Sequence, residues 1–225
     1  MEQNIKFSKT DFWAGLIIGE ISAWLIIAVI NNLGFQIPLL VFLPVIFPVL
    51  CIAGLFISFF IGKKIPVIYQ IGKFVLVGGF NTLVDWGILA FLIFFFRVYF
   101  LSEPGDILLS AGVIAVAYYS LYKAASFLVA VGNSYFWNKF WTFKRESSED
   151  MGKEFGQFLI VTFIGFLLNV FIASMIFKYI VPFGGLTLDQ WGIISAVFAT
   201  AVSMVWNFLG YKFMVFGANK AEKIK

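Results

Sequence analysis

Two lysines stand near the ends of apolar stretches, each among aromatic residues. The segment "NSYFWNKFWTF" contains Lys139, and the segment "YKFMVF" contains Lys212. A cation at the end of a membrane span suits an anionic headgroup that approaches from the leaflet, and Asn138 and Trp141 flank the first lysine. These four residues could hold a lipid phosphate while the aromatic side chains pack its first isoprene units. The alternative is an interfacial anchor, because snorkelling lysines among Trp and Tyr are ordinary at membrane surfaces.

Two further charged residues, Asp85 and Lys123, lie inside apolar stretches. A charge at the centre of a bilayer costs at least ~2.5–3.5 kcal/mol on insertion scales, so each should face the helix bundle and find a partner. We expect the two residues to pair with each other. The pair could serve only to fasten two helices, or it could line a polar cleft through which a sugar or phosphate headgroup passes.

Amide side chains add to this polar interior. The same four apolar stretches contain Asn81, Asn133, Asn138, Asn169 and Asn207. Such amides can join membrane helices by hydrogen bonds worth ~0.6–2 kcal/mol each, or they can bind sugar hydroxyls. The predicted headgroup cleft consists of Asn81, Asp85, Lys123, Asn169 and Asn207.

The composition is that of an integral membrane protein. Of the 225 residues, 61% are hydrophobic and only 12% are charged, which excludes a soluble globule. A single cysteine, Cys51, and no histidine exclude a disulfide framework and any ordinary Cys/His metal site. The lack of histidine also removes the commonest general base. We therefore expect no metal, no cofactor and no enzymatic activity. The net charge of +4 follows from membrane orientation and implies no nucleic-acid partner.

The hydropathy pattern predicts six membrane spans. They cover about residues 12–31, 38–61, 72–96, 109–137, 155–180 and 190–213. All should be helices, because an open strand cannot satisfy its backbone groups in lipid. We expect Pro44 and Pro48 to kink the second span. We expect Gly78 and Gly79 to allow close approach of helices.

The distribution of basic residues predicts the orientation of the chain. With six spans, most of the 16 Lys and Arg residues fall on one side. These are Lys6, Lys9, Lys63, Lys64, Lys73, Lys139, Lys144, Arg145, Lys153, Lys212, Lys220, Lys223 and Lys225. Only Arg97 and Lys178 fall on the other side. Because basic residues favour the cytoplasm, both termini of this multi-pass protein should be cytoplasmic, with the protein in the cell membrane.

The last four spans contain an internal repeat. An alignment of "IGKFVLVGGFNTLVDW" with "FGQFLIVTFIGFLLNV" places Asp85 on Asn169, and "NKFWTF" against "YKFMVF" places Lys139 on Lys212. Each unit is a pair of spans that returns the chain to the same side, so the repeats are parallel. Repeats of this kind often place a binding site at their interface. The predicted fold is an all-α integral membrane protein of six transmembrane helices, the last four forming two parallel-repeat helix pairs.

Four segments resemble the spans of GtrA-like proteins. They are "KFVLVGGFNTLVDWGILAFLI", "SFLVAVGNSYFWNKFWTFKR", "FLIVTFIGFLLNVFIA" and "ATAVSMVWNFLGYKFMVF". The resemblance covers about residues 70–217, and N-K-x-W-T-F is its most specific motif. It divides the chain into a two-helix extension (1–68), a four-helix GtrA-like membrane domain (69–217) and a cytoplasmic tail (218–225).

The resemblance implies movement of a polyprenyl-phosphate-linked sugar across the membrane, and a glycosyltransferase as a partner. Carried over by motif, the site residues are Asn81, Asp85, Lys123, Asn138, Lys139, Trp141, Asn207 and Lys212. Two features depart from the family pattern. Ser134 occupies the position expected for an asparagine, with Asn133 one residue earlier. The first two spans have no counterpart, and their expected task is homo-oligomerisation or docking of a transferase.

Three functions compete. The first is a flippase for a polyprenyl-phosphate-linked monosaccharide that serves polysaccharide or cell-wall glycosylation. No G-x-x-x-x-G-K-[ST] loop is present, so mass action rather than ATP would drive it. The second is a scaffold that recruits a polyprenyl-phosphate glycosyltransferase without transport. The third, an ion or small-molecule transporter, would require Asp85 or Glu20 to titrate during turnover.

Overall fold

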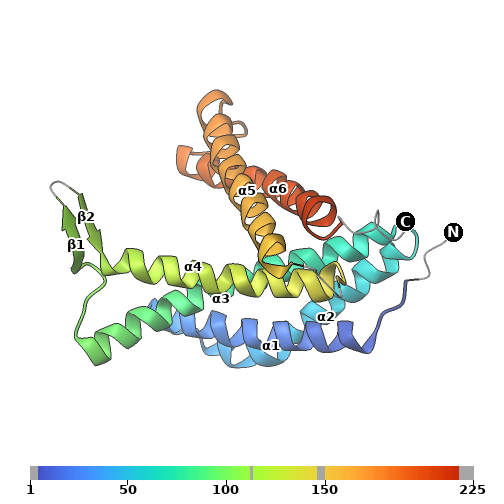
Figure 1. The fold of residues 1–225 in the computed structure, drawn as a ribbon, viewed down its shortest axis with the longest axis horizontal. Helices are drawn as coiled ribbons and strands as arrows, with labels where there is room; N and C mark the ends of the chain where they lie inside the picture. The colour runs from blue at the N-terminus through green and yellow to red at the C-terminus, as the bar shows by residue number, and fades with distance from the viewer. Residues whose placement is uncertain (1–4, 112–113, 146–149, 218–225) are drawn as a thin grey trace. The chain divides into compact units, whose positions relative to one another are not determined.

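The computed structural model describes residues 5–111, 114–145 and 150–217 (Figure 1). The chain forms two compact units, Met1–Thr142 and Phe143–Lys225, and each is described by itself. The predicted cytoplasmic tail at 218–225 lies outside the described residues.

The first unit is built from helices, with one short strand pair. Its elements are α1 (Lys9–Asn32), η1 (Pro38–Phe42), α2 (Leu43–Gly62), α3 (Pro66–Phe100), β1 (Ile107–Ala111), β2 (Ile114–Ala117), α4 (Tyr118–Trp137) and the π-helical turn η2 (Asn138–Thr142). Helices α1 and α2 pack on each other and on α3, and α4 returns along α3 (Figure 1). The predicted extension is thus packed directly on the first helix pair of the predicted repeat.

The second unit is a helix pair. It contains α5 (Met151–Tyr179), α6 (Leu188–Gly210) and a second π-helical turn, η3 (Tyr211–Val215). Small side chains on α6 are buried at every fourth residue, at Ser195, Ala199 and Ser203. This spacing keeps one face of the helix against α5 and allows the two backbones to approach closely.

The predicted fourth span, 109–137, is wrong in its first third. Strands β1 and β2 form an antiparallel pair in which Ile107 pairs with Ala117 and Ala111 with Ile114. The backbone N–H of Tyr118 donates to the carbonyl of Asp106 at 2.9 Å, which joins the base of the strand pair to the start of α4. β-Branched residues among small ones favour strands over a helix here, a preference that apolar content alone does not reveal.

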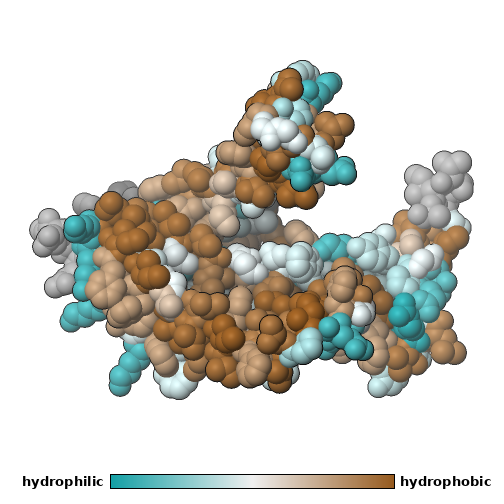
Figure 2. All heavy atoms as spheres, turned by 180° about the vertical axis from the view of Figure 1, so that it is seen from behind, coloured by the Kyte–Doolittle hydropathy of each residue, from teal (hydrophilic) through white to brown (hydrophobic). Residues whose placement is uncertain are grey.

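The remaining predicted spans correspond to helices. Among the described residues, five helices are long and apolar enough to cross a membrane: Lys9–Asn31, Pro38–Gly62, Pro66–Phe100, Met151–Tyr179 and Leu188–Val215. Helix α4 carries Lys123 and Asn133 and falls outside this set by composition. Figure 2 shows apolar side chains over much of the visible surface. The exposed large hydrophobic residues include Phe91, Phe166 and Ile193. The all-α membrane class predicted from the sequence is confirmed.

Two details of the predicted helix packing are wrong. Pro44 lies in the first turn of α2, where proline is tolerated, so only Pro48 is inside the helix. A Cβ placed on Gly78 or Gly79 would meet no atom within 4 Å. The close approach occurs instead at Gly19 of α1, where an added Cβ would meet the Cα of Pro48 on α2.

This contact generates a stability prediction. Gly19→Ala should lower the free energy of unfolding by ~1–3 kcal/mol, because the methyl group meets backbone that cannot rotate away. The matched control is Gly54→Ala on α2, where nothing lies within 4 Å of an added Cβ. Alanine is the better helix former, so this control should be neutral or slightly stabilising. Thermal unfolding in detergent measures both. Equal melting temperatures for the two variants would contradict the tight α1–α2 contact.

Candidate functional site

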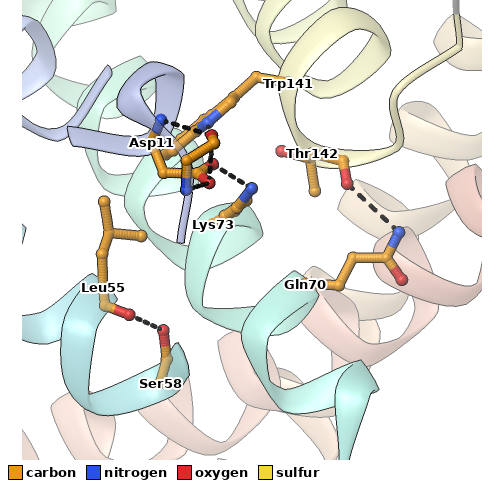
Figure 3. Close-up of polar contacts among 8 residues, drawn as sticks. Asp11, Leu55, Ser58, Gln70, Lys73, Trp141 and Thr142 are labelled. Atoms are coloured by element: carbon orange, nitrogen blue, oxygen red, sulfur yellow. Dashed lines mark hydrogen bonds and ion pairs between the residues drawn. The ribbon is translucent and has the colours of Figure 1, made fainter. Parts of the chain in front are cut away.

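Side chains from three elements meet around one buried carboxylate. Asp11, in the first turn of α1, accepts a hydrogen bond from Trp141 Nε1 at 2.9 Å and forms an ion pair with Lys73 of α3 through the same oxygen (Figure 3). Its other oxygen accepts from the backbone N–H of Ser8 at 2.9 Å and from the Ser8 hydroxyl at 2.6 Å. With Tyr69, these residues are called the Asp11 cluster below.

The local sequence explains why the Asp11 cluster forms. Ser8 is the N-cap of α1, and Ser8 and Asp11 cap each other reciprocally, which fixes the carboxylate at the helix start. Lys73 lies one turn after Tyr69 on α3, and its Nζ is 4.5 Å from the centroid of the Tyr69 ring and 5.3 Å from that of Trp141. Asp11 is 0%, Lys73 3% and Trp141 4% exposed. The charges are therefore removed from solvent but matched by charge-assisted hydrogen bonds.

The π-helical turn η2 carries three of the predicted phosphate-binding residues. Trp141 is fixed by Asp11, and the following carbonyl, that of Thr142, accepts from Gln70 Nε2 at 3.3 Å. Asn138 is buried, and its amide nitrogen donates to the Ser134 carbonyl at 2.9 Å. The Oδ1 atom of Asn138 is buried without a hydrogen-bond partner. That carbonyl oxygen can accept a hydrogen bond but cannot donate one.

The two predicted lysines occupy matching positions in the two units. Lys139 lies in η2, with its Nζ 5.4 Å from the Tyr135 ring and 5.5 Å from the Phe140 ring. Lys212 lies in η3, 5.4 Å from Phe208 and 5.7 Å from Phe213. In each case the rings belong to the residues four before and one after the lysine.

The surroundings of the two lysines differ. Lys139 is 1% exposed, and its Nζ donates to the Tyr135 hydroxyl at 3.2 Å, whereas Lys212 is half-buried. Both cations are held beside aromatic rings by cation–π contacts.

The predicted pairing of Asp85 with Lys123 is confirmed. The two side chains form an ion pair between α3 and α4, and the Ser126 hydroxyl donates to the second carboxylate oxygen at 2.7 Å. The Asp85 side chain is 18% and the Lys123 side chain 41% exposed, so the pair lies at the edge of the first unit. The two helices that it joins are otherwise mostly apolar, and the ion pair leaves part of its charge accessible.

The predicted cleft amides fall into two groups. In the first unit, Asn133 donates to Asn81 at 3.4 Å across α3 and α4. In the second unit, Asn169 donates to Thr200 at 3.2 Å, across α5 and α6. The side chain of Asn207 lies directly against Gly165 and has a buried carbonyl oxygen without a hydrogen-bond partner. The structure brings Asn81, Asp85 and Lys123 into one unit and Asn169 and Asn207 into the other.

Sequence reasoning missed the Asp11 cluster. From the sequence, Lys73 is only one of the predicted cytoplasmic basic residues, and no role is predicted for Asp11. The S-x-x-D pattern at Ser8 is a helix-start signal that could have located the cap. Nothing in the sequence pairs Asp11 with a residue 62 positions away. In the part of the chain that the structure describes, no three acidic or cysteine side chains are grouped so as to hold a metal ion.

Comparison with known proteins identifies the family. A family model described as "GtrA/DPMS, transmembrane domain" matches residues 73–216, more than half of the chain. The chain is also 30% identical over 150 residues to the "Uncharacterized membrane protein YngA" of Bacillus subtilis (strain 168), across 67% of this chain and 81% of that protein. No solved structure matches. The matched region begins at Lys73 of the Asp11 cluster and includes both π-helical turns, and the chain belongs to the GtrA/DPMS transmembrane-domain family.

Proposed function

We propose that this protein is a flippase that moves a polyprenyl-phosphate-linked monosaccharide across the membrane. The observation that carries the proposal is the repeated turn: η2 and η3 each hold a lysine between two aromatic rings at the same sequence offsets. A headgroup phosphate is the anion that a membrane protein of this family would meet, because the family acts in lipid-linked sugar glycosylation. Its members are generally non-catalytic membrane proteins.

The polar groups of the two turns suit different parts of a lipid-linked sugar headgroup. Lys212 is half-buried and would meet the phosphate from the leaflet, while the aromatic rings beside it pack the first isoprene units. Asn138 suits a different partner, because its amide nitrogen is occupied by Ser134 and its carbonyl oxygen needs a donor. A sugar hydroxyl is such a donor, whereas an ionised phosphate oxygen is not.

The polar groups inside each helix pair would line a path for the headgroup along that pair. Asp85, Lys123 and Ser126 supply charges and a hydroxyl on α3 and α4. At the aligned position of the second unit, Asn169 supplies an amide that contacts Thr200. The isoprenoid tail would stay in lipid while the headgroup passes. Synthesis of the lipid-linked sugar by a glycosyltransferase on one face and its use on the other would drive net movement.

The phosphate site is tested by native mass spectrometry of the protein in nanodiscs that contain undecaprenyl phosphate. We expect the wild type to retain the lipid and Lys139→Ala/Lys212→Ala to lose at least nine-tenths of it. The matched control is Lys63→Ala, since Lys63 also lies over two phenylalanine rings but outside the family domain. This control should bind as the wild type does.

Two results would count against the flippase. Equal loss of lipid in Lys63→Ala would show that aromatic-flanked lysines bind anionic lipid without specificity. A protein that retains no polyprenyl phosphate but copurifies from its own membrane with a glycosyltransferase would favour the scaffold function instead.

The intramembrane ion pair separates transport from scaffolding. Asp85→Asn leaves Lys123 without its counter-charge, and we expect it to reduce the movement of a short-chain polyprenyl-phosphate hexose in proteoliposomes at least tenfold. It should also destabilise the protein by ~1–3 kcal/mol, less than the ~3–5 kcal/mol of a fully buried broken pair, because Lys123 is 41% exposed.

The double variant Asp85→Asn/Lys123→Met removes both charges and serves as the control for folding. It should regain thermal stability without regaining transport. Wild-type transport by the double variant would mean that the pair only fastens α3 to α4.

A further inference from the structure

We infer that Asp11 is a positioning residue that holds the π-helical turn η2, and that the α1–α2 extension therefore completes the binding site of the family domain within the same chain. The mechanical part of this inference stands on the contacts of the first unit alone. Its consequence for lipid binding rests on the proposed function.

The first step is the charge balance of Lys73. This lysine is the first residue of the region that matches the family model, and its side chain is only 4% exposed. A buried ammonium group requires a counter-charge, and the counter-charge comes from Asp11, which lies outside the matched region. A residue of the extension thus neutralises a cation of the family domain.

The second step is the fixing of Trp141. Its indole N–H donates to the same carboxylate oxygen that pairs with Lys73. The ring belongs to an apolar core cluster contributed by α1, α2 and α3, whose other buried members are Ala14, Ile18, Leu55, Val77 and Phe80. Residues of the extension therefore take part in both the polar and the apolar surroundings of Trp141.

The third step is the need of a π-helical turn for outside support. Such turns are rare and occur mostly as single-turn features at functional sites. In η2 the support comes from Asp11 through Trp141 and from Gln70 through the Thr142 carbonyl. In η3 the residue aligned with Trp141 is Met214, which is 53% exposed. The second turn thus lacks this side-chain anchor and provides an internal reference.

Together these steps link the extension to the predicted ligands. Asn138 and Lys139 precede Trp141 within the same turn, so a shift of the Trp141 ring would move the carbonyl oxygen and the ammonium group. Asp11 acts on them through Trp141 and does not itself touch the ligand.

Hydrogen exchange measured by mass spectrometry in nanodiscs tests the mechanical part. Asp11→Ala and Trp141→Phe should each raise the exchange rate of the amides at 138–142 at least tenfold, and leave those at 211–215 unchanged. The matched control is Trp137→Phe, which removes an indole that packs on the same core cluster but keeps the Asp11 bond. Its exchange at 138–142 should stay within about twofold of the wild-type rate.

The inference is overturned if 138–142 exchanges at the wild-type rate in Trp141→Phe, or if 211–215 loosens equally with it. Should Asp11→Ala fail to fold, Trp141→Phe alone decides, because it preserves the Asp11–Lys73 ion pair. Equal loosening in Trp137→Phe would also overturn it, since the effect would then be loss of ring volume rather than of the Asp11 bond.

Binding of undecaprenyl phosphate by native mass spectrometry then tests the consequence for the site. Asp11→Ala and Trp141→Phe should each weaken binding several-fold, and the double variant should be no weaker than the worse single variant, because both act through one contact. Additive losses would overturn the linkage through Trp141. If the wild type binds no polyprenyl phosphate, the proposed function fails, while the exchange experiment still decides the role of Asp11.

Discussion

The constraint on which this structure depends is that a charged side chain within an apolar helix bundle needs a polar or oppositely charged partner beside it. The first unit meets it twice, with Asp11 against Lys73 and with Asp85 against Lys123. The first pair is buried, and its carboxylate accepts four hydrogen bonds. It therefore holds α1, α3 and η2 together. The second pair has a lysine that is 41% exposed and a single hydroxyl neighbour. Burial and the full set of hydrogen bonds suit the first pair to a structural role. Under the proposed function, the exposure of the second pair suits it to contact with a headgroup.

The internal repeat extends from the sequence to an unusual local conformation. The motif "NKFWTF" and its counterpart "YKFMVF" are aligned on their lysines, and the π-helical turns begin one residue before each lysine. Because π turns are seldom found in helices, their recurrence at aligned positions is a stronger sign of a common origin for the two helix pairs than the few shared residues are. The aligned residues Asp85 and Asn169 likewise each make polar interhelical contacts within their own helix pair.

Much of this fold follows from composition and hydropathy, because lipid allows little besides helices. The ion pair between Asp85 and Lys123 could also be predicted, because an unpaired charge in the bilayer is costly. The strand pair β1–β2 could not be predicted, because a short apolar run is equally consistent with the start of a membrane span. The Asp11 cluster escaped notice because Asp11 and Lys73 sit near predicted span ends, where charges are ordinary. Only tertiary packing shows that both are buried.

The two π-helical turns have diverged in a way that bears on mechanism. Trp141 is hydrogen-bonded to Asp11 of α1 and is 4% exposed, whereas Met214 at the aligned position is 53% exposed. Lys139 is buried and bonded to a tyrosine hydroxyl, whereas Lys212 is half-buried beside phenylalanine rings that offer no hydrogen bond. A lipid phosphate has less to displace at the second turn than at the first. Under the proposed function, η3 is therefore the place of first capture, and η2 is the turn whose geometry the extension sets in advance.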